Sequence, residues 1–233
     1  MTDRPPNQTR PVRLEVGYTD ATPGSVLISM GETRVLCTAS VESEVPRWMK
    51  DSGKGWVTAE YGMLPGSSPQ RVRRDHVSGG RAKEISRLIG RSLRAAVNLS
   101  KMPDIMIRVD CDVIQADGGT RTAAVTGGWI ALHQALEHAV DRGLIDELPV
   151  VDEIAAISVG IVDGEPRLDL DYDLDVAAEV DMNVVMSGRG LFIEVQGTAE
   201  QAPFTREELD TLLDLAGRGI SELHELQREA VKP

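Results

Sequence analysis

The stretch ADGGTRTAAVTGG, residues 116–128, joins two segments that differ in the spacing of their apolar residues. Residues 105–115, before it, are rich in apolar and β-branched side chains, which predicts a strand. After the paired glycines, apolar side chains recur at helical spacing and predict a helix over residues 122–142. The chain therefore passes from strand to helix through a glycine turn and places Arg121 at the start of the helix, with no further lysine or arginine before Arg142.

This junction has the features of an anion-binding site. Gly118 and Gly119 allow the backbone to come close to a ligand. The first amides of a helix have no partner within it and lie at the positive end of its dipole, so they favour an anion. Arg121 can add two charge-assisted hydrogen bonds. Gly119, Thr120 and Arg121 are therefore candidate phosphate-binding residues, although a glycine turn that only starts a helix is the commoner meaning of such a pattern.

A second helix start has the same pattern. Gly79 and Gly80 precede Arg81 at the beginning of a helix predicted over residues 81–99. An arginine in the first turn opposes the helix dipole, at a cost of about a few tenths of a kcal/mol. Beside a bound anion the same placement is favourable, so Arg81 is a candidate for the same phosphate site.

The acidic candidates lie further along the chain. Residues 167–174 predict a strand with aspartates on one face and mainly leucines on the other, and we expect Asp169 and Asp171 to lie on a solvated face. Asp175 and Asp181 differ, because they stand near the end of this strand and the start of the next. Asp181 also has apolar neighbours, which leave a carboxylate in need of a partner. Two carboxylates brought together by a tight return can bind Mg²⁺ or Mn²⁺ through oxygen, so Asp175 and Asp181 are candidate metal ligands.

The remaining pattern predicts an α+β fold without a linker that would divide it. Residues 42–80 are rich in turn formers and predict a long exposed loop. We therefore expect a single domain over residues 1–233, with a core over residues 10–228 and peripheral ends. The other expected elements are strands at 13–18, 25–30, 33–41, 154–162, 181–187 and 191–197, a hairpin turn at Asp163-Gly164, and a last helix that opens with a capping box from Thr205 to Glu208.

Composition limits the class of protein. The chain has 233 residues, of which 41% are hydrophobic and 27% charged, as in ordinary globular proteins. No apolar run reaches the ~18–20 residues of a membrane span, and the amino terminus lacks the apolar core of a signal peptide. We therefore expect a cytoplasmic protein with no membrane partner. Cys37 and Cys111 lie in strand-like apolar runs, which predicts buried free thiols.

The net charge of −12 argues against a protein that coats nucleic acid with basic residues. The charge is uneven, however, because the segment 71–94 is mainly basic and the segment 141–181 mainly acidic. This fits a site that holds phosphates on one side and a divalent cation on the other, or two solvated surfaces of opposite sign. The four histidines do not have zinc-site spacing, there is no Walker loop or nucleophile elbow, and the aromatic content of 3% offers no RNA-stacking signature.

Taken in order, these segments resemble the ribonuclease PH family of phosphate-dependent exoribonucleases. The resemblance extends from about Arg10 into the last helix, and it is closer than that to polynucleotide phosphorylase or exosome ring subunits, which share the fold. The matching segments are Gly24–Leu27, Arg34–Ser40, Gly55–Pro65, Gly79–Arg81, Arg87–Ile89, Asp110–Thr122, Ser158–Val162, Glu179–Met186 and Glu194–Glu200.

The resemblance implies β-α-β-α units with mixed sheets flanked by helices, in a homohexamer built as a trimer of dimers. It implies trimming of RNA 3′ ends, chiefly of tRNA precursors, with inorganic phosphate as co-substrate and nucleoside diphosphates as products; the reverse reaction adds nucleotides. The implied metal is Mg²⁺ or Mn²⁺. The implied roles are phosphate binding by Arg81, Gly119, Thr120 and Arg121, catalysis by Arg121, Asp175 and Asp181, metal binding by Asp175 and Asp181, and RNA binding by Arg71 and Arg74.

The sequence departs from the family pattern in three places. The loop between Pro65 and Gly79 is shorter than usual, Gly66 stands where an arginine is common, and Thr2–Pro5 replaces a glycine–arginine start. All three affect regions that grip RNA or contact other subunits. Two alternatives remain: a non-catalytic RNA-binding ring subunit, which would be expected to lose Arg121 or an aspartate, and a hydrolytic nuclease with two metals, which would need no phosphate site.

Overall fold

The first of two β-sheets is formed by the amino-terminal half of the chain. The computed structural model describes residues 4–74, 79–200 and 203–232. In spatial order the sheet consists of β1 (Val12–Val16), β2 (Gly24–Met30), β3 (Thr33–Glu42), β5 (Met106–Gln115) and β4 (Trp56–Met63). β4 pairs with β5 in parallel and the other neighbours are antiparallel, so the sheet is mixed.

The second sheet is antiparallel. Its spatial order is β7 (Glu165–Leu168), β6 (Ile154–Val162), β8 (Val180–Ser187) and β9 (Phe192–Ala199). Asp163 and Gly164, both with positive φ, make the tight turn from β6 to β7 that the sequence predicts. β6 is buried along its whole length, which explains its nearly uninterrupted apolar sequence.

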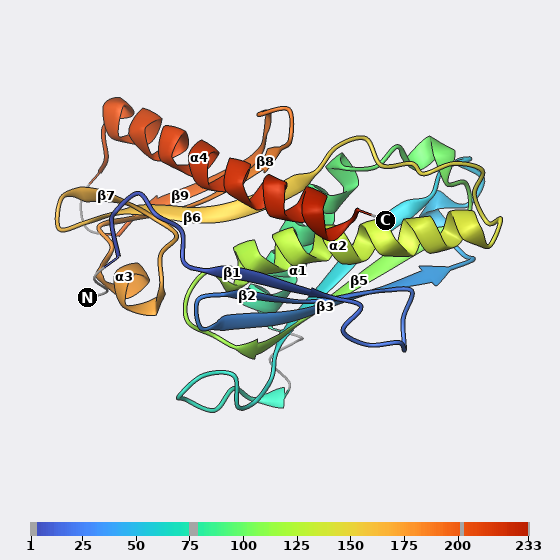
Figure 1. Cartoon of the computed structure of the whole chain (residues 1–233), viewed down its shortest axis with the longest axis horizontal. Coiled ribbons are helices and arrows are strands. Elements are labelled where there is room, and N and C mark those ends of the chain that lie inside the picture. The colour runs from blue at the N-terminus through green and yellow to red at the C-terminus, as the bar shows by residue number, and fades with distance from the viewer. Residues whose placement is uncertain (1–3, 75–78, 201–202, 233) are drawn as a thin grey trace.

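Helices pack between and over the sheets. Those in the described residues are α1 (Gly80–Ala95), α2 (Thr120–Asp141), α3 (Tyr172–Ala177) and α4 (Arg206–Ala230), with short 3₁₀ turns at Arg47–Met49 and Leu99–Lys101. Figure 1 shows α2 between the first sheet and α4, and α2 also contacts β6. Because α2 is enclosed on all sides, residues 122–133 are buried without interruption. The arrangement confirms the predicted α+β fold.

Two predictions for residues 42–99 are wrong. β4 lies inside the predicted loop over residues 42–80, where Val57, Ala59 and Tyr61 alternate toward the core. Turn-rich segments on both sides obscured this short pattern. The helix predicted over residues 81–99 ends at Ala95. Residues 75–78 of the predicted loop lie outside the described residues.

The strand predicted over residues 167–174 ends at Leu168. Asp169 has a positive φ of 56°, and Asp171 caps α3 by accepting a hydrogen bond from the amide of Leu174. The expected solvated face is also wrong, because Asp169 and Asp171 are 0% and 4% exposed. Alternating leucine and aspartate fits a strand, but here the two aspartates accept hydrogen bonds from buried donors.

Other local predictions are confirmed. Thr205 and Glu208 form the capping box that starts α4. Cys37 and Cys111 are opposite each other on β3 and β5 as buried free thiols. Within the ranges that the structure describes, no helix combines the length and the apolar character needed to cross a membrane.

Candidate active site

A cleft of about 1330 Å³ contains most of the candidate residues. Its walls come from residues 63–121, in the half of the chain that forms the first sheet, and from residues 158–200, in the half that forms the second. The candidate residues that line it are Arg71, Arg81, Gly119, Thr120, Arg121, Asp175 and Asp181. The fold therefore brings the basic and acidic candidates, which are far apart in sequence, into one site.

The amino ends of α1 and α2 lie at this cleft and have no side-chain cap among the described residues. Gly119 is the N-cap of α2, so the helix begins at Thr120, and no described side chain caps it. Gly79 is the N-cap of α1, and again no described side chain caps the helix. The described first turns of both helices contain no Asp or Glu. Their unpaired amides can therefore bind an anion.

The other two helices are different. Asp171 caps α3 and Thr205 caps α4, and both helices carry acidic residues in the first turn. Such side chains satisfy the free amides and the positive end of the dipole. In the described chain, the two helices without a side-chain cap are thus the two whose arginines line the cleft.

The glycines before α2 have a packing role that the sequence analysis did not predict. Both lie in the left-handed region, with φ of 70° for Gly118 and 65° for Gly119. A Cβ on Gly118 would lie 2.6 to 2.8 Å from backbone atoms of Leu170, Asp171 and Tyr172. Glycine is therefore needed for the close contact between this turn and the segment that leads into α3, and not only for access by a ligand.

Arg10 connects the same turn to the second half of the chain. Its Nε and Nη2 donate hydrogen bonds to the carboxylate of Asp169 at 2.9 and 2.7 Å, and its Nη1 donates to the carbonyl oxygen of Asp117 at 2.5 Å. Burial alone would lower the pKa of Arg10, but the hydrogen bond and charge of Asp169 outweigh it, so the pKa is raised. Thr33 donates to the carbonyl oxygen of Gly118 and so holds the turn from the other side.

Residues from three other elements hold Thr120 and Arg121. Arg121 Nη1 lies 3.6 Å from Glu84 Oε1 on α1 and 3.4 Å from Gln196 Oε1 on β9. The hydroxyl of Thr120 lies 2.8 Å from that of Tyr61 on β4. Tyr61 is 2% exposed, and burial raises its pKa, which keeps its hydroxyl neutral at physiological pH. These contacts orient both side chains before a ligand binds.

Asp175 on α3 and Asp181 on β8 supply the negative charge of the cleft. Burial raises the pKa of Asp181 to about 6, and the charge of Asp175 adds to the effect. Burial also raises the pKa of Asp175, while the charges of Arg81 and Arg121 oppose that shift. The two carboxylates and the two arginines therefore lie close enough to influence one another.

The acidic pair fits a divalent cation. Asp181 Oδ1 is buried and has no hydrogen-bond partner among the described residues, which leaves an acceptor available to a metal. No three His, Cys, Asp or Glu side chains of the described chain are grouped closely enough to form a metal site by themselves. Asp175 and Asp181 could therefore supply two ligands, and water or substrate phosphates the rest, as is usual for Mg²⁺.

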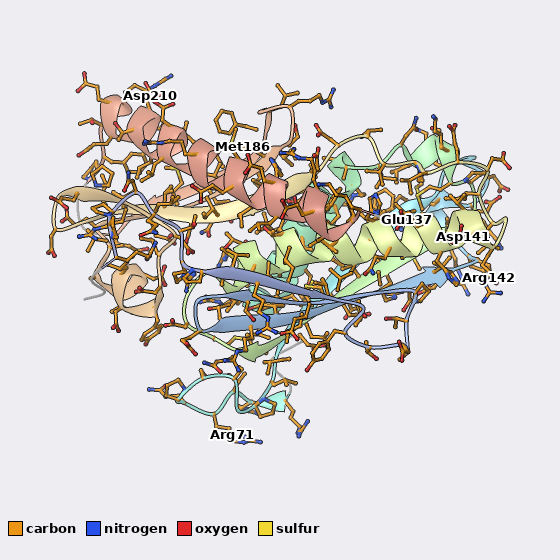
Figure 2. The ribbon with its side chains drawn as sticks, viewed as in Figure 1. Arg71, Glu137, Asp141, Arg142, Met186 and Asp210 are labelled. Atoms are coloured by element: carbon orange, nitrogen blue, oxygen red, sulfur yellow. The ribbon has the colours of Figure 1, made fainter. Side chains whose placement is uncertain are left out.

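The arginines expected to bind RNA differ in position. Arg71 is exposed and lines the cleft, and Figure 2 shows it on a loop that projects away from the sheets. Arg74 is exposed but is not among the described residues that line the cleft, whereas Arg73 is.

The sequence analysis missed several residues of the cleft. Asn183 could have been found, because it lies two residues after Asp181 and so on the same face of β8. Tyr172 was missed because it was placed on the apolar face of a predicted strand, and Val176 because no helix was predicted over residues 172–177. Glu200, just after β9, had no local signal at all.

Comparisons with known proteins show the family to which the chain is related. Residues 8–136 match the 3′ exoribonuclease family, domain 1, and residues 152–219 match domain 2 of the same family. A ribonuclease PH from Corynebacterium efficiens is 52% identical over 231 residues, which cover 98% of this chain and 94% of that protein.

Solved structures share the fold at lower identity. The crystal structure of rice (Oryza sativa) Rrp46 is 20% identical with a TM-score of 0.81, and the comparison covers 99% of each chain. The Archaeoglobus fulgidus exosome with RNA bound to the active site is 20% identical with a TM-score of 0.82, over 98% of this chain and 91% of that one. At this level of identity the likeness is one of fold.

Proposed function

The chain belongs to the 3′ exoribonuclease family, and from this premise we infer that it is a phosphorolytic 3′→5′ exoribonuclease that uses inorganic phosphate as co-substrate. The observation that carries the inference is the mixed charge of one cleft. Two helix starts that no described side chain caps, each with an arginine, share it with the carboxylates of Asp175 and Asp181. Attack by one phosphate on another requires such a site, because catalysis of phosphoryl transfer depends on positioning and charge stabilisation.

In our proposal inorganic phosphate binds at the amides of Gly119 and Thr120. Arg121, held by Glu84 and Gln196, can present its planar guanidinium to two phosphate oxygens, and Arg81 supplies a further positive charge. The hydrogen bond between Tyr61 and Thr120 fixes the orientation of the Thr120 hydroxyl beside this anion.

The reaction replaces one ester bond of the bound RNA. An oxygen of inorganic phosphate attacks the phosphorus of the last phosphodiester, the bond from that phosphorus to the 3′ oxygen of the preceding nucleotide breaks, and a nucleoside diphosphate leaves. The new 3′ hydroxyl takes up the proton that the attacking phosphate loses. Asp181, which lines the cleft, is the proposed carrier of that proton.

We propose that Asp175 and Asp181 hold the Mg²⁺ or Mn²⁺ of the site. The support is the buried, unpartnered Oδ1 of Asp181 together with the raised pKa of both carboxyl groups. The metal, when bound, offsets negative charge on the scissile phosphodiester.

We extend the proposal to substrate, assembly and location. The 3′ ends of tRNA precursors are the proposed substrates, with Arg71 and Arg74 gripping the RNA, and nucleotide addition is the reverse reaction. The proposed active form is a cytoplasmic homohexamer, a trimer of dimers, in which residues 1–233 of each copy act as one domain. The support is the 52% identity to a ribonuclease PH and, for a ring, the fold shared with the archaeal exosome core.

One assay tests the reaction. A short RNA is incubated with the protein and Mg²⁺, with and without phosphate, and the released nucleotides are identified. Nucleoside diphosphates that appear only with phosphate support phosphorolysis. Monophosphates released without phosphate would indicate hydrolysis, and RNA that binds without being shortened would indicate a non-catalytic ring subunit.

A pair of variants assigns the activity to this cleft. Arg121→Ala removes the arginine at the start of α2, and Arg142→Ala removes one that Figure 2 shows at the carboxyl end of the same helix. Only the first should lower the rate of diphosphate release strongly, by about 10²–10³-fold at limiting phosphate. Equal activity of the two variants at limiting phosphate would contradict the proposed phosphate site.

A further inference from the structure

The short helix α3 presents an exposed apolar surface to the cleft. Tyr172 is 61% exposed and Val176 is 69% exposed, and both line the cleft. Asp175 lies between them in sequence and within one helical turn of both, so the three side chains share a face. An apolar surface thus lies directly beside a carboxylate of the candidate active site.

The backbone of Tyr172 lies against the turn that starts α2. Its amide nitrogen would be 2.8 Å from a Cβ on Gly118, and the amide also hydrogen-bonds to the carboxylate of Asp117. Tyr172 therefore lies next to the turn of the proposed phosphate site and within one helical turn of Asp175, and all of them line one cleft. This is where the end of an RNA chain must lie if its last phosphodiester is to be attacked.

Aromatic residues are scarce in this chain, which has three Trp, three Tyr and two Phe. Among the described residues that line the cleft, Tyr172 is the one aromatic side chain. A tyrosine in a buried core is explained by packing, but Tyr172 is too exposed for that explanation. Leu174, on the opposite side of α3, is the residue that anchors the helix, at 5% exposure.

We propose that Tyr172, flanked by Val176, is the stacking platform for the base of the 3′-terminal nucleotide of the RNA. The proposal rests on the proposed function and adds the subsite that binds the nucleotide to be released. Stacking on an aromatic ring accepts every base, because each base has a π face. The platform therefore suits an enzyme that removes successive nucleotides of different identity.

The first test compares substitutions at Tyr172. Tyr172→Ala should weaken RNA binding by about 5- to 150-fold, the range expected for one base stacked on an aromatic ring. Tyr172→Phe and Tyr172→Trp keep the ring and should retain binding. Tyr18→Ala is the matched control, because Tyr18 is 50% exposed and is not among the described residues that line the cleft. In turnover assays, Tyr172→Ala should raise the KM for RNA and leave the KM for phosphate unchanged.

The second test identifies the nucleotide. RNA binding is measured without phosphate, with an oligonucleotide whose terminal nucleotide carries its base and with one whose terminal nucleotide is abasic. The proposal predicts that wild type loses affinity for the abasic RNA and that Tyr172→Ala does not. RNA with its terminal base should quench the fluorescence of the tryptophan introduced in Tyr172→Trp, beyond any quenching in wild type. This readout needs no catalysis.

Several outcomes would overturn the platform while leaving phosphorolysis standing. One is an affinity for RNA that is unchanged in Tyr172→Ala. Another is that removal of the terminal base lowers the affinity of wild type and of Tyr172→Ala equally. A loss by Tyr172→Phe as large as that by Tyr172→Ala would assign the effect to the hydroxyl. Sedimentation in which Tyr172→Ala alone breaks up the assembly would assign Tyr172 to a contact between copies. If diphosphates never appear but the abasic pattern holds, the proposed reaction fails and the platform stands.

Discussion

Replacing Arg10 by methionine should destabilise the protein strongly. The guanidinium of Arg10 and the carboxylate of Asp169 are 6% and 0% exposed, and the backbone amide of Arg10 adds a third hydrogen bond to this carboxylate at 2.8 Å. Removing one partner of a buried ion pair typically costs about 3–5 kcal/mol, mainly because the other charge stays buried. Arg10→Met should therefore lower the free energy of unfolding by about 3–5 kcal/mol.

A double-mutant cycle separates the pair from its surroundings. Asp169→Asn is the suitable second change, because Asn tolerates the positive φ of 56° and carries no charge. The free energy of unfolding should fall less in the double variant than the sum of its decreases in the two single variants, with a coupling energy of about 0.5–3 kcal/mol. Arg13→Met is the control: the Arg13–Glu15 pair is 75% and 40% exposed, so its loss should cost less than about 1 kcal/mol.

Urea unfolding at a fixed protein concentration measures all four variants, since stability of an assembled protein depends on concentration. The reasoning would be refuted if Arg10→Met lost no more stability than Arg13→Met. It would also be refuted if the stability losses of the two single variants simply added up in the double variant. The kinetics of the Arg10→Met protein that remains folded give a further readout. Because Arg10 also holds the carbonyl group of Asp117, its loss should raise the KM for phosphate more than the KM for RNA.

Three other predictions follow from the cleft. Arg121→Ala should lower the rate at limiting phosphate by about 10²–10³-fold, measured as diphosphate release, and circular dichroism should show an intact fold. Tyr61→Phe removes the 2.8 Å hydrogen bond to Thr120 and should cost about 0.5–1.5 kcal/mol in urea unfolding, with a higher KM for phosphate. The pKa of Asp181 is raised from 3.8 to about 6, so the folded state keeps this proton to a higher pH than the unfolded state does. With a chelator present, stability should therefore fall as pH rises through this window, and Asp181→Asn should flatten that dependence; an unchanged slope would contradict it.

The positive half of the site could be predicted from sequence because its signal is local. A glycine pair followed by an arginine at the start of a helix is visible within a few residues, at Arg81 and again at Arg121. The structure shows both helices beginning within two residues of the expected positions and lining one cleft. What the local signal could not reveal is why Gly118 is required, since the backbone that packs against it lies about fifty residues later.

The acidic half was harder because its decisive contacts are long-range. Asp169 lies 159 residues after Arg10, and the sequence around Asp169 does not indicate a buried cationic partner. The alternation of leucine and aspartate then made a strand the natural prediction for residues 167–174. Asp181 was still a candidate because a carboxylate among apolar residues signals a need for a partner in any secondary structure, and Asp175 because it stands near the end of the predicted strand; both line the cleft.

The charge distribution explains how an acidic chain can act on RNA. With a net charge of −12, most of the surface repels a polyanion, and Figure 2 shows acidic residues at sites away from Arg71: Asp210 near the start of α4, and Glu137 and Asp141 toward the carboxyl end of α2. The arginines that line the cleft are Arg71, Arg73, Arg81 and Arg121. Attraction concentrated in and beside this cleft favours entry of an RNA end over binding along the body of the RNA, because fewer backbone phosphates are then neutralised at once. An enzyme that must release and re-engage a shortening 3′ end benefits from that restriction.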